Sequence, residues 1–290
     1  MGALLRRFWM PALLSAELPE PNGDPVRLRL LGEDLLAWRD GSGQVAILDE
    51  LCPHRGASLA LARCEGDGLR CLYHGWKFAA DGRVLDTPNI AGSSIKDKVR
   101  ATSYPVAEAG EMIWVYLGPR DRQPELPQFK FMTATPEHRL IRRTILDCNW
   151  VQSIEGHLDS SHAGILHRDW DPFGRGTDQR FVQMVRSNNG LATDDDAPRI
   201  EVEDTAFGFH SAAVREARRG TDNVSYARIH TFALPWLTII PPGTFFFEVP
   251  IDDEHVSIVS ATWDPAKPID RSNAFKIFGS PRSEEHTSEL

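Results

Sequence analysis

Two short motifs decide how this chain folds: Cys52-Pro53-His54-Arg55-Gly56 and Cys71-Leu72-Tyr73-His74-Gly75-Trp76. Sixteen residues, Arg55 to Arg70, separate the histidine of the first motif from the cysteine of the second. A glycine follows shortly after each histidine and suits a tight loop, because glycine adopts backbone conformations that other residues avoid. Two mixed pairs of thiolate and imidazole ligands, carried by two loops, predict one shared metal centre.

The chemistry of the four ligands favours an iron–sulfur cluster at this centre. In a [2Fe–2S] cluster of the Rieske type, two thiolates bind one iron and two imidazoles bind the other. Such clusters have potentials of roughly −150 to +300 mV, against about −400 mV for plant-type clusters held by cysteines alone. A zinc site is the main alternative, but zinc fingers usually keep the cysteine pair apart from the histidine pair. Chance proximity of the four residues is the third reading.

The composition is that of an ordinary globular protein with room for two domains. The chain has 290 residues, of which 41% are apolar and 25% charged, and its formal net charge is −9. The acidic balance argues against nucleic acid as a partner. No apolar run approaches the ~20 residues of a membrane-spanning helix. Besides the two motif cysteines, Cys64 and Cys148 are expected to be free thiols in a reducing cytoplasm.

The N-terminal part of the chain predicts a small antiparallel β domain over residues 1–127, with the two ligand loops at one end. Met1 to Ala16 loosely resembles a signal peptide, but its apolar stretch is short and contains a proline, so a buried entry segment is expected. Asp81-Gly82 is a strong hairpin signal. The strands expected in this domain are Val26–Leu30, Leu35–Arg39, Val45–Leu48, Lys77-Phe78, Val84-Leu85 and Met112–Leu117.

A second domain is predicted over residues 128–281, with one larger antiparallel sheet and packed helices. The fold class is therefore α+β. A helix is expected from Asn149 to about Gly164. The strands expected here are Arg139–Leu146, Val182–Arg186, Ile200–Glu203, Phe209–Arg215, Tyr226–Phe232, Thr238–Ile240, Thr244–Glu248 and Val256–Trp263, which are rich in β-branched and aromatic residues.

The expected helix carries a second group of polar residues. Glu155, Asp159 and His162 are spaced i, i+4, i+7, so one continuous helix would bring them to one face. His167 lies five residues beyond His162 and converges with it only if the helix bends or ends, with Gly164 a plausible place. Two histidines with a carboxylate form the facial triad of non-haem Fe(II) oxygenases. Asp159 is better placed to orient His162 through its free ring nitrogen.

The two motifs together resemble the large (α) subunit of Rieske non-haem iron ring-hydroxylating oxygenases. The opening segment from Leu4 to Leu14 and the lead-in Asp147-Cys148-Asn149-Trp150 resemble the branch that contains phthalate 4,5-dioxygenase and phenoxybenzoate dioxygenase. The resemblance implies that Cys52, His54, Cys71 and His74 hold the [2Fe–2S] cluster, and that His162 and His167 bind a mononuclear Fe(II). It implies that Asp159 carries an electron from the cluster of one subunit to the iron of its neighbour in a trimer.

The resemblance also implies an activity and its partners. The family adds one or both atoms of O₂ to an aromatic acid or a methoxy-aromatic, using NAD(P)H electrons that arrive through a separate flavin- or ferredoxin-type reductase. Dioxygenation of an aromatic acid is the first expectation, and O-demethylation is the alternative. An electron-carrying Rieske protein without an active oxygenase site and a zinc-stabilised binding protein remain as rivals.

The C-terminal part of the sequence departs from the family pattern. The family's third iron ligand is an aspartate far downstream of the two histidines, and Asp252, Asp253, Asp264 and Asp270 all come too early for it. The last nine residues, Arg282 to Leu290, resemble the translation of a sequencing-library adapter and are expected to be non-native. The sequence therefore predicts a catalytic domain without its C-terminal part, and weak binding of Fe(II) with impaired activity is the expected consequence.

Several surrounding residues carry weaker expectations. His210, His230, Phe232, Trp236 and Phe246 are expected on strands that line a pocket above the iron, while His157 is expected to face solvent or another subunit. Between Cys52 and Arg83, five basic residues outnumber three acidic ones. This local balance either steers an acidic electron donor to the cluster or only keeps the loops soluble, and the sequence does not favour one over the other. The basic residues are Arg55, Arg63, Arg70, Lys77 and Arg83.

Overall fold

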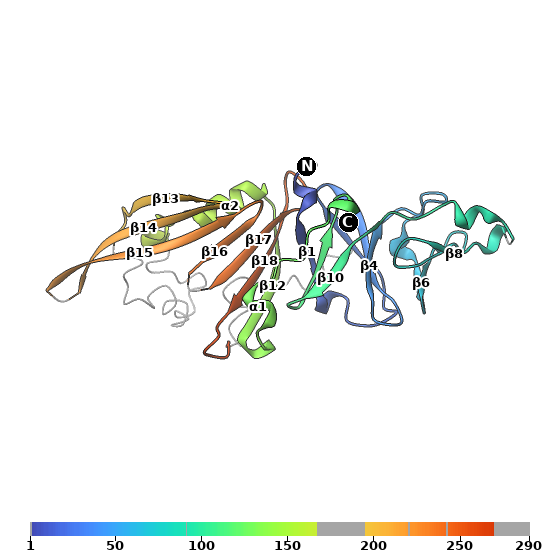
Figure 1. Ribbon diagram of the computed structural model, residues 1–290, viewed down its shortest axis with the longest axis horizontal. Helices are drawn as coiled ribbons and strands as arrows, with labels where there is room; N and C mark the ends of the chain where they lie inside the picture. Colours follow the sequence, from blue (N-terminus) through green and yellow to red (C-terminus); the bar gives the residue numbers. More distant parts are fainter. Residues whose placement is uncertain (1, 91, 167–194, 220, 242, 270–290) are drawn as a thin grey trace.

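The structure is a computed structural model that describes residues 2–90, 92–166, 195–219, 221–241 and 243–269 (Figure 1). Across these ranges the chain forms four antiparallel sheets, three of them small and one large. Figure 1 draws an elongated molecule, with the sheet of β6 and β8 at one end and the large sheet toward the other. The α+β class expected from the sequence is confirmed.

The three small sheets build the N-terminal part. The outermost has the order β5-β6-β7-β8 and consists of Arg63–Glu65, Gly68–Arg70, Lys77–Phe78 and Val84–Asp86. The next has the order β2-β3-β4-β9 and consists of Val26–Leu30, Glu33–Arg39, Val45–Asp49 and Ser103–Tyr104. The third has the order β1-β11-β10 and consists of Trp9–Leu14, Met112–Tyr116 and Val106–Ala109.

The entry segment is buried, as expected. β1 pairs with β11, and all residues from Trp9 to Leu13 are buried. All five residues of β11 are buried as well, because the strand lies between β1 and β10 and is covered on both faces. Trp114 of β11 contacts Phe247 of the large sheet edge to face, with ring centroids 5.3 Å apart. One hydrophobic core thus joins the N-terminal sheets to the large sheet.

The large sheet has the order β12-β18-β17-β16-β15-β14-β13. Its strands are β12 (Arg139–Leu146), β13 (Arg199–Thr205), β14 (Gly208–Arg219), β15 (Asp222–Ala233), β16 (Leu237–Ile240), β17 (Thr244–Pro250) and β18 (Val256–Trp263). The α-helices of the described residues are α1 (Lys130–Thr133), α2 (Trp150–Leu158) and α3 (Ala163–Leu166). Helix α2 packs on β15, β16 and β17. The face of the sheet that meets α2 is called the inner face below.

Short 3₁₀ turns connect many of these elements. In the described residues they are η1 (Leu5–Arg7), η2 (Ser15–Glu17), η3 (Leu59–Leu61), η4 (Pro88–Ile90), η5 (Ser94–Asp97), η6 (Arg120–Arg122) and η7 (Pro136–His138). The expected strands Val26–Leu30, Arg139–Leu146 and Val256–Trp263 have the bounds given by the sequence. The expected strand Val182–Arg186 lies outside the described residues.

The expected single helix from Asn149 to Gly164 is wrong. Helix α2 begins after Asn149, whose side chain accepts the amide N–H of Val151 at 3.0 Å, but it ends at Leu158. Asp159 leaves the helix with an extended backbone (φ −64°, ψ 125°), and α3 starts only at Ala163. Aspartate and serine side chains offer nearby amides an alternative to helical hydrogen bonds, and Asp159-Ser160-Ser161 is such a run. The break between the two short helices contains both Asp159 and His162.

The hairpin between β7 and β8 yields a stability prediction. Gly82 has φ +82°, and a Cβ there would lie 2.1 Å from the carbonyl oxygen of Ala101. Gly43 has φ +90°, yet a Cβ there would meet nothing within 4 Å. Gly43→Ala should therefore cost only the left-handed backbone conformation, about 1 kcal/mol. Gly82→Ala must also displace a backbone carbonyl and should cost more than about 3 kcal/mol.

The comparison is made by urea unfolding of both variants beside the parent chain, followed by tryptophan fluorescence. Equal losses of stability in the two variants would show that the close approach to Ala101 is not what requires glycine at this turn.

Candidate functional site

The two cysteine–histidine loops have the same backbone hydrogen bonds. In the first loop Cys52 N–H donates to the carbonyl of Ala57, and Gly56 N–H donates to the carbonyl of Cys52, both at 2.9 Å. In the second loop Cys71 N–H donates to the carbonyl of Trp76 at 2.9 Å, and Gly75 N–H donates to that of Cys71 at 3.0 Å. Each loop therefore closes on itself in the same way. The two loops form a matched pair that presents two cysteines and two histidines.

Glycine is required at the closing position of each loop. Gly56 has φ +67° and Gly75 has φ +75°, both in the left-handed region. At Gly75 a Cβ would also lie 2.7 Å from Cγ of Pro88. The sequence indicates these glycine positions, because each glycine lies four residues after its cysteine. His54 lies two residues after Cys52, whereas His74 lies three residues after Cys71. The two imidazoles therefore extend from different positions of otherwise similar loops.

The four side chains lie together in a largely buried site. Cys52 and Cys71 are only 3% and 4% exposed. Burial, with the neighbouring Cys71 thiol, raises the pKa of Cys52 to about 11. The rings of His54 and His74 have centroids 4.7 Å apart. Burial, with the neighbouring His74, lowers the pKa of His54 and keeps that imidazole neutral, as a metal ligand must be.

One polar atom in this site is buried without a hydrogen-bond partner, as a metal-ligating atom would be. Nδ1 of His74 is buried and has no hydrogen-bond partner among the described residues. A buried nitrogen without a partner costs free energy unless something binds it. Each loop supplies one thiol and one imidazole, and the resulting two thiols and two imidazoles match the donor set of a Rieske cluster, in which one iron takes both thiolates and the other takes both imidazoles. No three His, Cys, Asp or Glu side chains in the described ranges meet at one point as a single-ion site requires.

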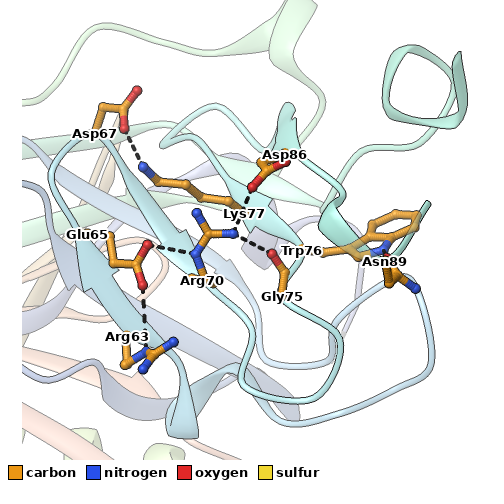
Figure 2. Close-up of polar contacts among 9 residues, drawn as sticks. All are labelled: Arg63, Glu65, Asp67, Arg70, Gly75, Trp76, Lys77, Asp86 and Asn89. Atoms are coloured by element: carbon orange, nitrogen blue, oxygen red, sulfur yellow. Dashed lines mark hydrogen bonds and ion pairs between the residues drawn. The ribbon is translucent and has the colours of Figure 1, made fainter. Parts of the chain in front are cut away.

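The second loop is braced from outside by Arg70 (Figure 2). Its Nη1 donates to the carbonyl of Gly75 at 2.6 Å and to Asp86 at 3.0 Å, and its Nε donates to Glu65 at 2.6 Å. Carboxylates on two sides hold the guanidinium against the loop. No pattern in the sequence indicates this contact, because it depends on how the strands around the loop fold.

The first loop is covered by Trp76. The indole ring stacks on His54 with centroids 4.5 Å apart and an interplanar angle of 5°. Its Nε1–H donates to Asn89 Oδ1 at 3.0 Å (Figure 2). The tryptophan follows the second motif directly in sequence, but its contact with the first histidine depends on how the two loops face each other. This residue shields one side of the site from water.

Most of the five basic residues near the loops form ion pairs with neighbouring acids. Arg70 and Lys77 have side chains only 20% and 15% exposed, and Lys77 pairs with Asp67 at 2.6 Å. Arg63 lies 3.6 Å from Glu65, and Arg83 lies 2.7 Å from Asp81. Arg55 is exposed and, within the described residues, has no ion pair. The acids that flank the basic residues in sequence neutralise them in space.

Four large apolar side chains in or near the ligand loops are exposed. Leu72 and Tyr73, which lie between Cys71 and His74, are 55% and 65% exposed. Leu51 and Leu61 are 60% and 66% exposed. Exposed apolar side chains that gather on one surface are typical of protein contact sites. These four side chains are called the apolar rim below.

The second candidate site lies at the break after α2. Asp159 Oδ1 accepts the N–H of Ser161 at 2.8 Å, while Oδ2 accepts the N–H of His162 at 3.3 Å and lies 2.9 Å from Nδ1 of the same histidine. The expected contact between Asp159 and His162 is therefore present. A tight turn produces it rather than a shared helical face. Glu155 contributes only its backbone carbonyl, which accepts the amide of Asp159 at 2.9 Å.

The electrostatics of this turn suit a metal ligand and its orienting acid. Burial alone would raise the pKa of Asp159, but the hydrogen bonds from Ser161 and His162 outweigh it and lower that pKa. The carboxylate is thus charged, and it receives the Nδ1 proton of His162. Nε2 of His162 is then the ring nitrogen that carries the lone pair. The side chain of Asp159 is 46% exposed and that of His162 is 35% exposed, so the turn lies at the surface.

The expectation that His157 faces solvent or another subunit is wrong. Its Nδ1 lies 2.7 Å from Oε1 of Glu248, and its ring stacks on Phe246 with centroids 4.1 Å apart. Glu248 is fully buried, and burial raises its pKa despite the contact with His157. The contact joins α2 to β17 beneath the helix. Glu248 was missed because nothing in the strand sequence marks which glutamate points inward.

The residues expected to line a pocket divide between different environments. His230 is buried on the inner face, where its Nδ1 lies 3.2 Å from the carbonyl of Leu158, the last residue of α2. Trp236 belongs to the main core and contacts Phe8, so it is not a pocket residue. His210 contacts Thr231 and lies on the face opposite to His230, since neighbouring strand positions alternate. Phe232 and Phe246 share the inner face with His230.

The other histidine expected to bind iron, His167, lies outside the described residues. So does Asp270, one of the aspartates that come too early in the sequence for the third ligand. Of the others, Asp252 contacts His255 at 2.8 Å, and Asp264 accepts the amides of Ala266 and Lys267 in a local turn. Within the described residues, no helix is long and apolar enough to cross a membrane.

Comparisons with known proteins match both parts of the chain. The family model described as Rieske [2Fe-2S] domain matches residues 8–105. The model described as LigXa C-terminal domain like matches residues 115–282. The oxygenase subunit of phthalate 4,5-dioxygenase from Pseudomonas putida is 40% identical over 91% of this chain and 60% of its own length.

Two further relatives extend the comparison. The oxygenase subunit of 5,5'-dehydrodivanillate O-demethylase from Sphingobium sp. (strain NBRC 103272 / SYK-6) is 35% identical over 91% of this chain and 58% of its own length. The oxygenase in the reduced complex between oxygenase and ferredoxin of carbazole 1,9a-dioxygenase has the same fold, with a TM-score of 0.65 and 24% identity over 93% of this chain and 73% of that chain. The chain thus spans about three fifths of the two curated relatives.

The brace on the second loop gives a testable prediction. Arg70→Gln should loosen the loop, because the amide cannot bind Gly75, Glu65 and Asp86 together. Any bound cluster should then be lost several-fold faster on heating, measured as the decay of visible absorbance under argon. Arg63→Gln is the matched control, since Arg63 is 66% exposed and makes no contact with the loop. Equal decay rates in the two variants would contradict a bracing role for Arg70.

Proposed function

Because this chain belongs to the Rieske non-haem iron oxygenases, we propose that it is an oxygenase component that hydroxylates an aromatic acid with O₂. It would be the oxidoreductase member of a system in which NAD(P)H electrons arrive through a separate flavin- or ferredoxin-type reductase. The observation that carries the proposal is the matched pair of loops with their two thiols, two imidazoles and the unpartnered Nδ1 of His74. We place the system in the cytoplasm, where NAD(P)H and reduced thiols are available.

The site residues take the following roles in this proposal. Cys52, His54, Cys71 and His74 hold the [2Fe–2S] cluster, and His162 holds the mononuclear iron together with His167. When bound, the cluster supplies single electrons and the iron supplies the site for O₂. Asp159 keeps the Nδ1 proton on His162, so Nε2 carries the lone pair that would bind iron. Trp76 covers His54 and limits the access of water to the cluster site.

Electron transfer between two copies of the chain is part of the proposal. In Figure 1 the sheet of β6 and β8 lies at one end of the molecule, and α2 lies beyond the sheet that contains β1 and β10. Such an arrangement supports transfer from the loops of one subunit to Asp159 of another, in a trimer or a trimer-based assembly. The exposure of Asp159 and the apolar rim around Leu72 and Tyr73 give each end a surface for that contact.

The inner face supports an anionic substrate. Arg228 is partly buried next to His230 on β15, and no hydrogen bond or ion pair of its guanidinium occurs within the described residues. Burial lowers the pKa of Arg228, and the nearby Arg215 adds to this effect. A buried cation without an anion is costly, so a carboxylate ligand would compensate it. The name of the phthalate 4,5-dioxygenase relative agrees with an aromatic acid.

Two alternatives remain within reach of experiment. The O-demethylase relative favours attack on a methoxy-aromatic by the same metal sites. An electron-carrying Rieske protein without an active oxygenase site would use the loops alone. The first differs in the product formed, whereas the second differs in the iron content.

The metal content tests the proposal before any turnover assay. Protein prepared anaerobically with excess Fe(II), which compensates for weak binding at the mononuclear site, should be brown, show a reduced [2Fe–2S] EPR signal of low average g, and contain more than two irons per chain. His162→Ala should remove only the additional iron, and Cys71→Ala should remove the colour. Two irons in the parent chain would favour the electron-carrier alternative. Zinc without colour would overturn the proposal.

A second prediction concerns the substrate charge. Arg228→Met should weaken the binding of phthalate about 10- to 100-fold, because a charge-assisted hydrogen bond is lost. The binding of neutral phthalamide should change little, and this ligand serves as the matched control. Dissociation constants are measured by isothermal titration calorimetry, which needs no turnover. Equal losses for the acid and the amide would rule out Arg228 as the carboxylate group's partner.

A further inference from the structure

Three buried polar side chains reach from the large sheet to the end of α2 and the turn that follows it. They are Arg215 on β14, His230 on β15 and Glu248 on β17. The strand register puts all three on the inner face, because paired residues and residues two apart on a strand share a face. His230 pairs with Ser211, and Arg215 lies four residues after Ser211 on the same strand. Phe232, two residues after His230, pairs with Thr238, which pairs with Phe246, and Glu248 lies two residues after Phe246.

Arg215 contacts the turn itself. The residue is 0% exposed, and its guanidinium donates to the carbonyl of Ser160 and, at 3.2 Å, to that of Asp195. Ser160 lies between Asp159 and His162, and it is 4% exposed. No ion pair of Arg215 with a carboxylate occurs within the described residues. The buried charge is thus satisfied by backbone carbonyls, one of which belongs to the turn.

His230 holds the last residue of the helix. Its Nδ1 faces the carbonyl of Leu158, which only accepts hydrogen bonds, so Nδ1 must carry the ring proton. Burial, with the neighbouring Arg228, lowers the pKa of His230 to about 4, and the ring stays neutral in this role. The contact fixes the carbonyl at the C-terminal end of α2, where helical partners are missing.

Glu248 holds the helix one residue earlier. The contact between its Oε1 and Nδ1 of His157 spans 91 residues of sequence, and the carboxyl is 0% exposed. The three contacts therefore fall on His157, Leu158 and Ser160 in succession. Each comes from a different strand of the sheet. The direction in which the chain leaves α2 is fixed at three nearly consecutive points.

Stability alone does not explain such a row. Burying an arginine or a glutamate costs desolvation free energy, and apolar residues of the same size often stabilise a fold as well or better. Buried polar groups of this kind can instead fix one geometry among several. The geometry fixed here is that of the residues between Leu158 and Ala163, which form the proposed metal turn.

We propose that Arg215, His230 and Glu248 are positioning residues that hold Asp159 and His162 in the geometry required for iron binding and electron transfer. The inference rests on the proposed function for the roles of Asp159 and His162, but the mechanical part stands on the contacts alone. Arg215 is the central member, because it binds the turn between the two functional residues.

Hydrogen exchange of the parent chain and of three variants tests the mechanical part without any metal. Arg215→Met should speed exchange of the Ser161 and His162 amides about 10-fold, since both N–H groups donate to Asp159 only while the turn is held. Arg215→Lys keeps the charge but not the planar fork, and it should give an intermediate rate. Arg143→Met is the matched control. Arg143 lies on β12 of the same sheet and pairs with Glu17 of η2, so its loss should leave the exchange rates of the Ser161 and His162 amides unchanged.

Iron binding gives the second readout. Arg215→Met should bind the additional iron at least about 10-fold more weakly than the parent chain and broaden the EPR spectrum of its nitrosyl adduct, with the cluster signal unchanged. Unchanged exchange at Ser161 and His162 in both Arg215 variants would overturn the inference, as would equal acceleration across all peptides of Arg215→Lys. If the parent chain takes up no additional iron while the turn still loosens, the proposed function fails and the anchoring stands.

Discussion

The hydrogen bond from a glycine amide to a cysteine carbonyl, made once in each ligand loop, is the constraint on which the electron-transfer end of the molecule depends. It closes a ring of five residues in which the glycine needs a positive φ. With the loop closed, the cysteine points inward and the histidine lies within reach of its counterpart in the other loop. Arg70, Trp76 and the apolar rim support or cover the two closed loops.

The other end of the molecule is organised on a different physical basis. The break after Leu158 is made by Asp159, whose carboxylate accepts the amides of Ser161 and His162 in place of helical partners. A turn of this kind is local, but a surface turn held only by its own aspartate would sample several conformations. The contacts from β14, β15 and β17 supply the missing restraint from beneath. A local choice of backbone and a long-range set of buried polar contacts thus agree on one geometry.

The sequence predicted those features that depend on short-range patterns. Alternation and β-branched content located Arg139–Leu146 and Val256–Trp263 with their observed bounds, and the motif spacing located both ligand loops. The spacing of Asp159 and His162 predicted their contact, although through a continuous helix that does not exist. The contacts of Arg215 with Ser160 and of Glu248 with His157 join residues 55 and 91 positions apart. No local pattern marks such pairs, because their meeting depends on which strands become neighbours in the sheet.

The two ends of the molecule therefore tolerate substitutions in the large sheet differently. The ligand loops draw their shape from hydrogen bonds within each motif, so substitutions in the large sheet leave those bonds intact. The turn after α2 draws its shape from three strands of the sheet, so a substitution far away in sequence reaches it through Arg215, His230 or Glu248. Burial makes each of these groups expensive to leave unpaired, and this couples the register of the sheet to the position of Asp159. The geometry of the proposed iron site is therefore a property of the whole sheet, whereas the geometry of the cluster site is a property of two short loops.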